Sequence, residues 1–336
     1  PPATFHEGDG QVVIGTQMDK TQDVFQTHGW RQMLLTRCEG LAPIPTAVAH
    51  PCDPVSIEAA CEAAARGLIT PILVGPEARI RAVADKAGLD ISGFRLEATA
   101  HSHASADRAV ALVRSGEASL LMKGSLHTDE LMGAVTNAAT GLRTARRISH
   151  VYLMDVPRYP RPLLISDAAI NIAPSLEDKR DIVQNAIDLA HVLGIDQPRV
   201  AILSAVETIN SKLQSTLDAA ALCKMADRGQ ITGGLLDGPL AFDNAVSPEA
   251  ARDKGIVSQV AGQADILIVP DLVSGNILAK QLTFLAGADA AGVVAGARVP
   301  IILTSRADPE AARIASCAVA VLMAHAALAS LPGPLA

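Results

Sequence analysis

Short apolar runs alternate with amphipathic stretches along most of this chain. From Thr46 onward the pattern predicts strand-and-helix units: TAVAH before a helix over 54–66, TPILVG before 76–87, FRLEA before 103–115, and SLLMKG before 128–135. Such short apolar runs are typical of strands buried on both faces, and the helices between them supply the crossovers of a parallel sheet. The first half is therefore predicted to be a doubly wound α/β domain.

The pattern changes between residues 141 and 162. A basic cluster, the run ISHVYLMDV and the proline-rich VPRYPRP precede the next apolar run there, and so short a connection favours a β-hairpin within a mainly parallel array. RVAILSA, ITGGLLDGPL, ADILIVP and AGVVAGA then follow as strands separated by helices, and PIILTS lies one short turn later. With 336 residues, the chain is expected to form two domains.

Two of the late apolar runs end in polar clusters. These clusters are Asp271, Ser274, Asn276 and Lys280 after ADILIVP, and Ser305 and Arg306 after PIILT. Ligands of open α/β sheets bind beyond the carboxyl ends of strands, so both clusters are candidate sites. Asp308 is predicted to cap a helix that starts at Pro309 and runs to about Ala329, so the Ser-Arg pair precedes a helix N-terminus that favours an anion. The fork of donors on Arg306 suits a phosphoryl or carboxyl group.

Composition excludes several classes of function. Apolar residues make up 49% of the chain and aromatic residues 2%; the formal net charge is −7. This composition lacks the basic surface and the stacking platform of a nucleic-acid-binding protein. No uninterrupted apolar run approaches about 18 residues, and the first residues lack a signal-peptide pattern, so we expect a cytoplasmic protein without a membrane span. The five cysteines form no CxxC pair and are predicted to be free and mostly buried.

Three segments resemble the phosphate acetyltransferase and phosphate butyryltransferase family. They are PDLVSGNILAKQLTFLAGADAAGVV followed by GARVPIILTSRAD, MKGSLHTDELMGAV at 122–135, and LLISDAAINIAPSLEDK at 163–179. The resemblance covers roughly residues 45 to 330, and residues 1–44 carry no family signature. It implies a phosphate acyltransferase that moves a short acyl group, acetyl or butyryl, reversibly between coenzyme A and inorganic phosphate by direct attack of a thiolate on acyl phosphate.

The resemblance also implies an architecture and a set of partners. It predicts two doubly wound α/β/α domains with a cleft between them, like isocitrate and isopropylmalate dehydrogenases. The first domain would comprise residues 1–142 plus 299–336, with 1–44 as an unassigned extension, and the second residues 143–298. Acyl-CoA, CoA, phosphate and acyl phosphate are the expected partners of a homodimer. Coenzyme A acts as a co-substrate, and no tightly bound cofactor, metal, membrane or nucleic acid is expected.

The matching motifs supply candidate catalytic residues. By resemblance, Arg306 holds the phosphate, and Ser305 holds the thiol or a phosphate oxygen. The acetyl-specific branch has an aspartate several residues after its Ser-Arg pair, but here the nearby carboxylates are Asp308 and Glu310, at a different spacing. Asp308 is therefore either the acceptor of the thiol proton or only a helix cap. In the second case a positive site could lower the pKa of the thiol, and no dedicated base would be needed.

Further motif residues are candidates for substrate binding. In MKGSLHTDELMGAV the backbone N–H groups and hydroxyls of Gly124, Ser125, His127 and Thr128 would meet the acyl phosphate, and Lys123 adds a positive charge. The alternatives are a structural role for His127 and a capping role for Thr128. Asp167 and Asn171 either orient the site or touch substrate. After the polar turn, NILAKQLTFLA is predicted to be a helix that starts at Asn276. Asn276 and Lys280 lie four residues apart on one face of this helix, and the alternative for Lys280 is a solvated side chain.

Two other functions remain open at this stage. A metal- and NAD-dependent decarboxylating dehydrogenase of similar architecture would need metal-binding aspartates, for which Asp237, Asp243 and Asp271 are candidates without a matching constellation. A non-catalytic module that binds CoA or acyl phosphate is the second alternative. The His101–His103 pair lacks a third ligand at a suitable spacing, so no metal site is predicted.

Overall fold

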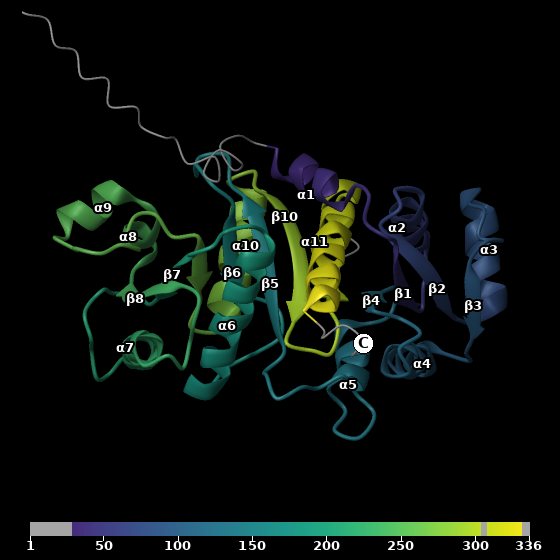
Figure 1. Cartoon of the computed structure of the whole chain (residues 1–336), viewed down its shortest axis with the longest axis horizontal. Helices are drawn as coiled ribbons and strands as arrows, with labels where there is room; N and C mark the ends of the chain where they lie inside the picture. Colours follow the sequence, from purple (N-terminus) through teal and green to yellow (C-terminus); the bar gives the residue numbers. More distant parts are fainter. Residues whose placement is uncertain (1–28, 304–307, 331–336) are drawn as a thin grey trace, which may run out of the picture.

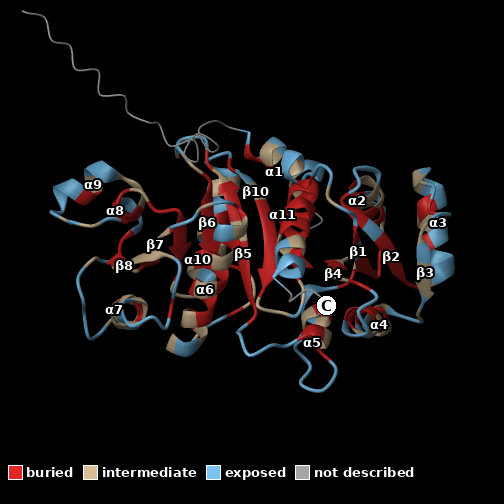
Figure 2. Ribbon diagram, viewed as in Figure 1, coloured by how far each residue is buried: buried red, intermediate tan, exposed pale blue. Residues whose placement is uncertain are grey.

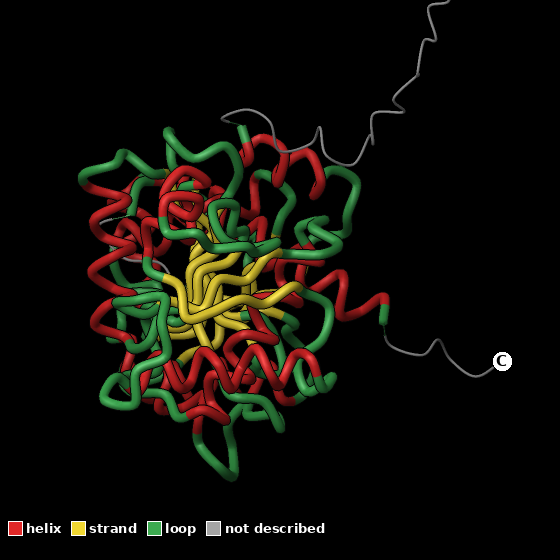
Figure 3. The backbone as a smooth tube through the Cα atoms, turned by 90° about the vertical axis from the view of Figure 1, so that its left-hand side faces the viewer, coloured by secondary structure: helices red, strands yellow, loops and turns green. Residues whose placement is uncertain are grey.

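The computed structural model describes residues 29–303 and 308–330. Within them, one eleven-stranded sheet has the order β3-β2-β1-β4-β11-β10-β5-β6-β9-β7-β8, with helices on both faces (Figure 1, Figure 3). The strands are β1 (Ile44–Ala49), β2 (Ile69–Gly75), β3 (Arg95–Ala98), β4 (Leu120–Lys123), β5 (Ser149–Asp155), β6 (Leu163–Ser166), β7 (Arg199–Leu203), β8 (Leu235–Leu240), β9 (Ile266–Ile268), β10 (Asp289–Ala295) and β11 (Ile301–Ile302). The helices are α1 (Trp30–Cys38), α2 (Pro54–Ala65), α3 (Glu77–Ala87), α4 (Ser102–Arg114), α5 (Thr128–Thr136), α6 (Leu176–Val192), α7 (Gln214–Asp227), α8 (Phe242–Val246), α9 (Pro248–Asp253), α10 (Leu272–Phe284) and α11 (Glu310–Ala329). The predicted α/β class is confirmed.

The first half of the sheet is wound in two directions from β1. β2 and β3 lie on one side of β1 and β4 on the other, and all four strands are parallel. α2 and α3 share one core cluster, which includes Ile57 and Ile80, whereas α4 and α5 cover the opposite face with Ala106 and Leu131. The topological switch point, where open α/β sheets bind ligands, is therefore between the carboxyl ends of β1 and β4.

The strand direction reverses between the two halves of the sheet. β11 is parallel to β4, but β10 is antiparallel to β11, β5 to β10, and β6 to β5, which confirms the predicted hairpin. β9, β7 and β8 then continue parallel to β6. The carboxyl ends of β9 and β11 therefore face opposite edges of the sheet, and the polar clusters that follow these two strands start from opposite edges.

One face of the sheet carries a single hydrophobic cluster, and the other face carries two. The continuous cluster joins α1, α2, α3, α6, α7 and α11 to alternate residues of strands from both halves, such as Leu73 and Ile266. On the other face one cluster packs α4 and α5, and a separate one packs α8, α9 and α10. His150 and Tyr152 of β5 lie between these two clusters, because their neighbours Val294 and Met154 belong to one cluster each.

α11 lies in the middle of the continuous face. Among the described residues it is the helix long and apolar enough to cross a membrane, yet 61% of its most apolar window is buried inside the protein. Figure 2 shows it buried along most of its length. α1 packs against it, with the thiol of Cys38 3.7 Å from the carbonyl oxygen of Ala318 and with Trp30 buried. Residues 30–38, unassigned from the sequence, thus belong to the core.

Two predicted helix starts are wrong. Pro309 occupies the N-cap of α11 and Glu310 is its first helical residue, so Asp308 is not the cap. Instead, Arg313 donates from Nη1 to the carbonyl oxygen of Asp308 at 2.6 Å. α10 begins at Leu272, four residues earlier than predicted at Asn276, because the Asp271 carboxylate accepts the N–H of Ser274 at 2.8 Å and caps the helix there.

Candidate active site

The loops after β1 and β4 are locked together at the switch point. The carbonyl oxygen of His50 accepts both the N–H and the hydroxyl of Ser125 at 2.9 Å, and the N–H of Gly124 donates to the carbonyl oxygen of Ala49 at 2.8 Å. A Cβ on Gly124 would lie 2.3 Å from the Ala49 oxygen, so only glycine allows this approach. Lys123 is paired with Ala49 in register and ends β4 beside this lock.

This lock corrects one prediction about the β4 loop. The N–H groups of Gly124 and Ser125 were expected to meet an acyl phosphate, but both donate to the β1 strand end. The two residues therefore hold the loops in place, because a backbone N–H that is already bonded offers little to a ligand. Cys52 joins the lock by donating its N–H to the Ser125 hydroxyl at 3.2 Å, and burial raises the pKa of its thiol to about 11, so this thiol stays protonated near neutral pH.

α5 begins at Thr128, as predicted, with His127 at the N-cap. The carboxylate of Glu130 accepts the N–H of His127 at 3.3 Å, and both His127 and Thr128 are exposed. Asp129 and Glu130 already place negative charge in the first turn of this helix. These carboxylates would repel a bound anion, so this helix N-terminus binds a phosphate poorly unless the positive charge of Lys123 offsets the repulsion.

A polar pair lies between the two hydrophobic clusters of the split face. The rings of His150 and Tyr152 meet edge to face with centroids 4.3 Å apart, and Gly292 lies opposite Tyr152, where a Cβ would be 2.7 Å from His150 Nε2. His150 Nδ1 is buried and has no hydrogen-bond partner among the described residues. Burial lowers the pKa of this imidazole, and the charge of Asp167 opposes the shift. Burial also raises the pKa of Tyr152, with the charges of Asp308 and Asp167 adding to it. Both carboxylates therefore lie near the Tyr152 ring.

Asp167 organises the turn after β6. Its carboxylate accepts the N–H groups of Ala169 at 3.0 Å, Ile170 at 3.1 Å and Asn171 at 3.0 Å. The side-chain amide of Asn171 donates to the same carboxylate and to the carbonyl oxygen of Ile148 at 2.9 Å. Because both oxygens of Asp167 are engaged and its side chain is buried, these contacts favour the orienting role over direct substrate contact.

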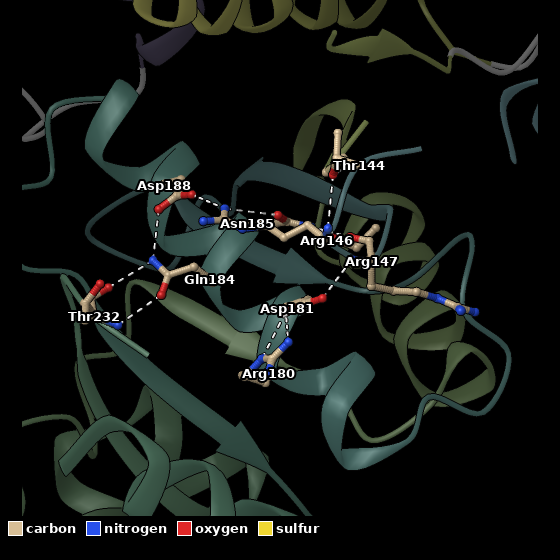
Figure 4. A network of polar contacts seen from close by, with 11 residues as sticks. Thr144, Arg146, Arg147, Arg180, Asp181, Gln184, Asn185, Asp188 and Thr232 are labelled. Carbon is tan, nitrogen blue, oxygen red and sulfur yellow. Dashed lines mark hydrogen bonds and ion pairs between the residues drawn. The ribbon is translucent and has the colours of Figure 1, made fainter. Parts of the chain in front are cut away.

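Arg147 connects that turn to α6. It donates from Nε to the Asn171 side-chain oxygen at 2.6 Å, while its own backbone N–H donates to Asp181 at 2.8 Å and its carbonyl oxygen accepts from Asn185 at 2.9 Å. Figure 4 shows Asp181 and Asn185 of α6 holding this segment of backbone. Arg147 belongs to the basic cluster noted in the sequence, but nothing in the sequence joined it to Asn171.

The neighbouring Arg146 faces a different space. It forms an ion pair with Asp188 on α6, and both residues line a cavity of about 540 Å³ whose other walls include Thr144 and Met323. The described residues predicted for the active site do not line this cavity.

Of the remaining candidates, Asn276 joins the Asp167 group. It donates from Nδ2 to the carbonyl oxygen of Ala168 at 3.3 Å and so ties α10 to the turn after β6. Lys280, one helical turn further on, is exposed. The structure therefore brings Asp167, Asn171 and Asn276 together, and it groups Lys123, Gly124 and Ser125 separately around His50.

Ser305 and Arg306, the predicted phosphate ligands, lie outside the described residues. β11, which ends just before them, is the parallel neighbour of β4, so its carboxyl end points to the edge of the switch point. Asp308 is half-buried, and its charge reaches Tyr152. In the ranges 29–303 and 308–330 no group of three or more His, Cys, Asp or Glu residues is arranged to hold a metal ion, so Asp237, Asp243 and Asp271 do not form one.

Sequence reasoning missed His50 and Arg147 as well as the pair formed by the buried His150 and the half-buried Tyr152. His50 follows the apolar run TAVA directly, so its place at a strand end was visible in the sequence. What the sequence does not show is that β1 and β4 are neighbours, because their pairing is non-local. The resulting switch point combines a lysine cation with an imidazole, which suits an anionic substrate and a proton transfer.

Comparisons with known proteins agree with this arrangement. Residues 97–321 match the family model described as "Phosphate acetyl/butaryl transferase". The chain is 65% identical over 291 residues to a phosphate acetyltransferase of Rhizobium meliloti, covering 87% of this chain and 92% of the relative, and 42% identical over 278 residues to a phosphate butyryltransferase of Clostridium acetobutylicum, covering 83% and 92%. A crystal structure of a branched-chain phosphotransacylase from Enterococcus faecalis V583 is similar with a TM-score of 0.72 at 30% identity, covering 84% of this chain and 99% of that one. The chain therefore belongs to the phosphate acetyl/butyryl transferase family and is a phosphate acyltransferase.

Proposed function

We propose that the protein transfers an acetyl group between coenzyme A and inorganic phosphate at the β1/β4 switch point, by direct attack of the thiolate on acetyl phosphate. The observation that carries this proposal is the position of Lys123 and His50 at neighbouring strand ends: Lys123 is paired in register with Ala49, which precedes His50, and the Ser125 lock holds the two loops together. A lysine cation stabilises a phosphoryl group electrostatically, and the edge lies where α/β sheets bind such ligands. The 65% identity to a phosphate acetyltransferase supports acetyl rather than butyryl as the preferred group.

The remaining roles follow from resemblance and geometry together. Arg306 binds the phosphate dianion and Ser305 positions the reacting group, since both follow β11, the strand beside β4. The Asp167 turn, with Asn171 and Asn276, holds the opposite half in place through Arg147.

Release of free thiol from acyl-CoA, detected with DTNB, tests this function. With acetyl-CoA we expect release that depends strictly on added phosphate and survives a chelator; with butyryl-CoA at the same phosphate concentration, kcat/KM should be at least about tenfold lower, the effect of 1.4 kcal/mol. Faster turnover of butyryl-CoA would reverse the assignment of the acyl group. Tight CoA binding with no thiol release would contradict catalysis altogether.

We also propose the finer architecture and assembly. Residues 1–142 plus 299–336 and residues 143–298 are taken as the two domains, like those of isocitrate and isopropylmalate dehydrogenases. The position of β11 beside β4 supports this division.

A cytoplasmic homodimer is proposed as the working state. Its support is an exposed apolar stripe on α10, where Val273, Ile277 and Phe284 are 60%, 53% and 77% exposed, close in sequence to the exposed Leu285. Light scattering on a sizing column should give twice the chain mass, and Ile277→Asp should give the single mass.

A further inference from the structure

His50 has a backbone conformation that its neighbours impose. Its φ is 57°, in the left-handed region that glycine prefers, and among the described residues it is the non-glycine residue found there. Such a conformation costs free energy and persists where the surrounding contacts hold it, often at functional sites. Here the carbonyl oxygen of His50 accepts hydrogen bonds from Ser125 and Cys52, so the strained residue is fixed against the β4 loop.

The hydrogen bonds of the imidazole identify which nitrogen carries the proton. His50 Nδ1 lies 3.0 Å from the hydroxyl of Ser105, and that hydroxyl lies 2.9 Å from the carbonyl oxygen of His101 and 2.8 Å from the hydroxyl of Thr99. A carbonyl oxygen can only accept, so the single hydroxyl proton of Ser105 goes to His101. The Ser105 oxygen must then accept from His50 Nδ1–H, and the lone pair of the imidazole is on Nε2.

Nε2 has no hydrogen-bond partner among the described residues, whereas Ser105 engages Nδ1. Nε2 does not belong to the fully buried polar atoms that lack a partner, so it keeps some accessible surface although His50 as a whole is 6% exposed. The charged and titratable groups around the ring are Arg79 on α3, Asp53 before α2, His101 before α4 and Glu130 on α5. Burial, followed by the charge of Arg79, lowers the pKa of His50, so the imidazole is neutral at neutral pH.

We propose that His50 is the general base that accepts the thiol proton of coenzyme A, and that Ser105 is the positioning residue that sets its tautomer. This inference rests on the proposed acyl transfer. As the S–C bond forms and the C–O bond to phosphate breaks, the thiol proton passes to Nε2, and the imidazolium returns a proton to the departing phosphate. Atoms and charge balance without any other reactant.

The alternative acceptor, Asp308, has less geometric support. It follows β11 on the far side of β4 from β1, and the charge it exerts falls on Tyr152. His50 in contrast directly follows β1, whose last residue, Ala49, is paired with Lys123.

The test is the pH dependence of kcat/KM for coenzyme A, with acetyl phosphate as the second substrate, in the variant His50→Asn. Asparagine tolerates the left-handed backbone and can keep the bond to Ser105, but it has no basic nitrogen. We expect kcat/KM at pH 7 to fall by about 10² or more, and the rate to rise about tenfold per pH unit between about pH 6 and 8, because only thiolate of pKa about 8.5 would then react. Wild-type kcat/KM should be flat between about pH 6.5 and 8, with its acidic limb below about pH 6.5.

Matched controls separate this role from structure and from the proposed function. His103→Asn, the same change at a nearby exposed histidine, should keep the wild-type profile. Ser105→Ala should lower kcat/KM by about tenfold, since it removes one hydrogen bond to a group that becomes charged, while leaving the acidic limb in place. A wild-type rate that itself rises tenfold per unit up to pH 8, or a His50→Asn profile that keeps the wild-type limb, would overturn the proposal. An enzyme with no phosphate-dependent thiol release would instead refute the function on which the proposal rests.

Discussion

The two faces of the sheet differ in how their apolar residues are distributed. On one face a single cluster spans both halves, with α11 at its centre, whereas on the other face two clusters are separated by His150, Tyr152 and the nearby Asp167. A continuous apolar layer holds the halves as one body, because any slippage would expose it to water. The face with two clusters can hold polar groups without interrupting the continuous apolar layer on the other face. We therefore expect the reacting residues among those at the strand ends of this split face.

The largest expected effect is at the edge of the split face, with Gly124→Ala. The new Cβ would lie 2.3 Å from Ala49 O and 2.6 Å from His50 O, and these backbone atoms cannot move away cheaply. We expect a loss of more than about 3 kcal/mol in the free energy of unfolding and at least a hundredfold loss of activity. Denaturant unfolding and the DTNB assay measure both.

Gly133→Ala is the control for that change. A Cβ at this position of α5 has no neighbour within 4 Å, so helix propensity should stabilise the protein by about 0.5–1 kcal/mol. Equal stability and equal activity of Gly124→Ala and Gly133→Ala would contradict the close approach of the β1 and β4 loops.

The next largest effect is expected from changing two neighbouring leucines of β6, which lie on opposite faces of the sheet. Leu164 belongs to the continuous cluster and Leu163 to one cluster of the split face, and both are buried. Each change to alanine should cost about 2–5 kcal/mol. Hydrogen exchange should show the loss spread over both halves for Leu164→Ala, including α2 and α11, and confined to the second half for Leu163→Ala. Identical exchange patterns would contradict the division into one cluster and two.

A smaller loss is expected from Asp167→Asn. The amide that replaces one carboxylate oxygen would face N–H donors of the turn, leaving about two bonds unmade. We expect a loss of about 2–3 kcal/mol in unfolding free energy, together with lower activity. Asp271→Asn, which keeps an acceptable cap on α10, should cost well under about 1 kcal/mol. If both changes lower the free energy of unfolding by the same amount, the hydrogen bonds of Asp167 stabilise the protein no more than those of an ordinary helix cap.

The smallest effect concerns acid stability and the buried His150. Burial holds its folded pKa below the ordinary value of about 6.5, so below that pH the unfolded chain binds a proton that the folded chain does not. The free energy of unfolding should therefore fall with decreasing pH, by up to about 1.4 kcal/mol per unit from this residue. His50 contributes in the same direction. His150→Gln should show a shallower decline than the wild type between pH 6.5 and 5, and an unchanged slope would mean that His150 titrates normally.

The sequence predicts individual elements better than their arrangement in space. Strand and helix positions follow from periodicity and end signals, so α2 and α5 lie where the pattern predicts them. The sequence pattern predicts helix caps less accurately than helices. Asp271 and Asp308 both precede a helix pattern, yet only Asp271 caps its helix. Whether an aspartate caps the helix that follows it depends on the backbone geometry at that position, and no local sequence pattern encodes this geometry.

Contacts between distant segments were the main omission. The bond between Arg147 and Asn171, the lock between His50 and Ser125, and the packing of α1 on α11 all depend on strand order. A buried apolar run does not reveal its neighbour or its direction. The family motifs include Asp167 and Asn171, which the structure joins by hydrogen bonds, but they do not include His50, whose proposed role depends on β1 lying beside β4.

The position of β11 has a consequence for biosynthesis. This strand, together with α11, is made last among the described elements, yet it is inserted between β4 and β10 and joins the two halves. Until residues 301–329 leave the ribosome, a growing chain has two unpaired strand edges and an uncovered apolar layer, which are the features that promote aggregation. Nascent chains of this protein should therefore depend on chaperones until these residues have emerged.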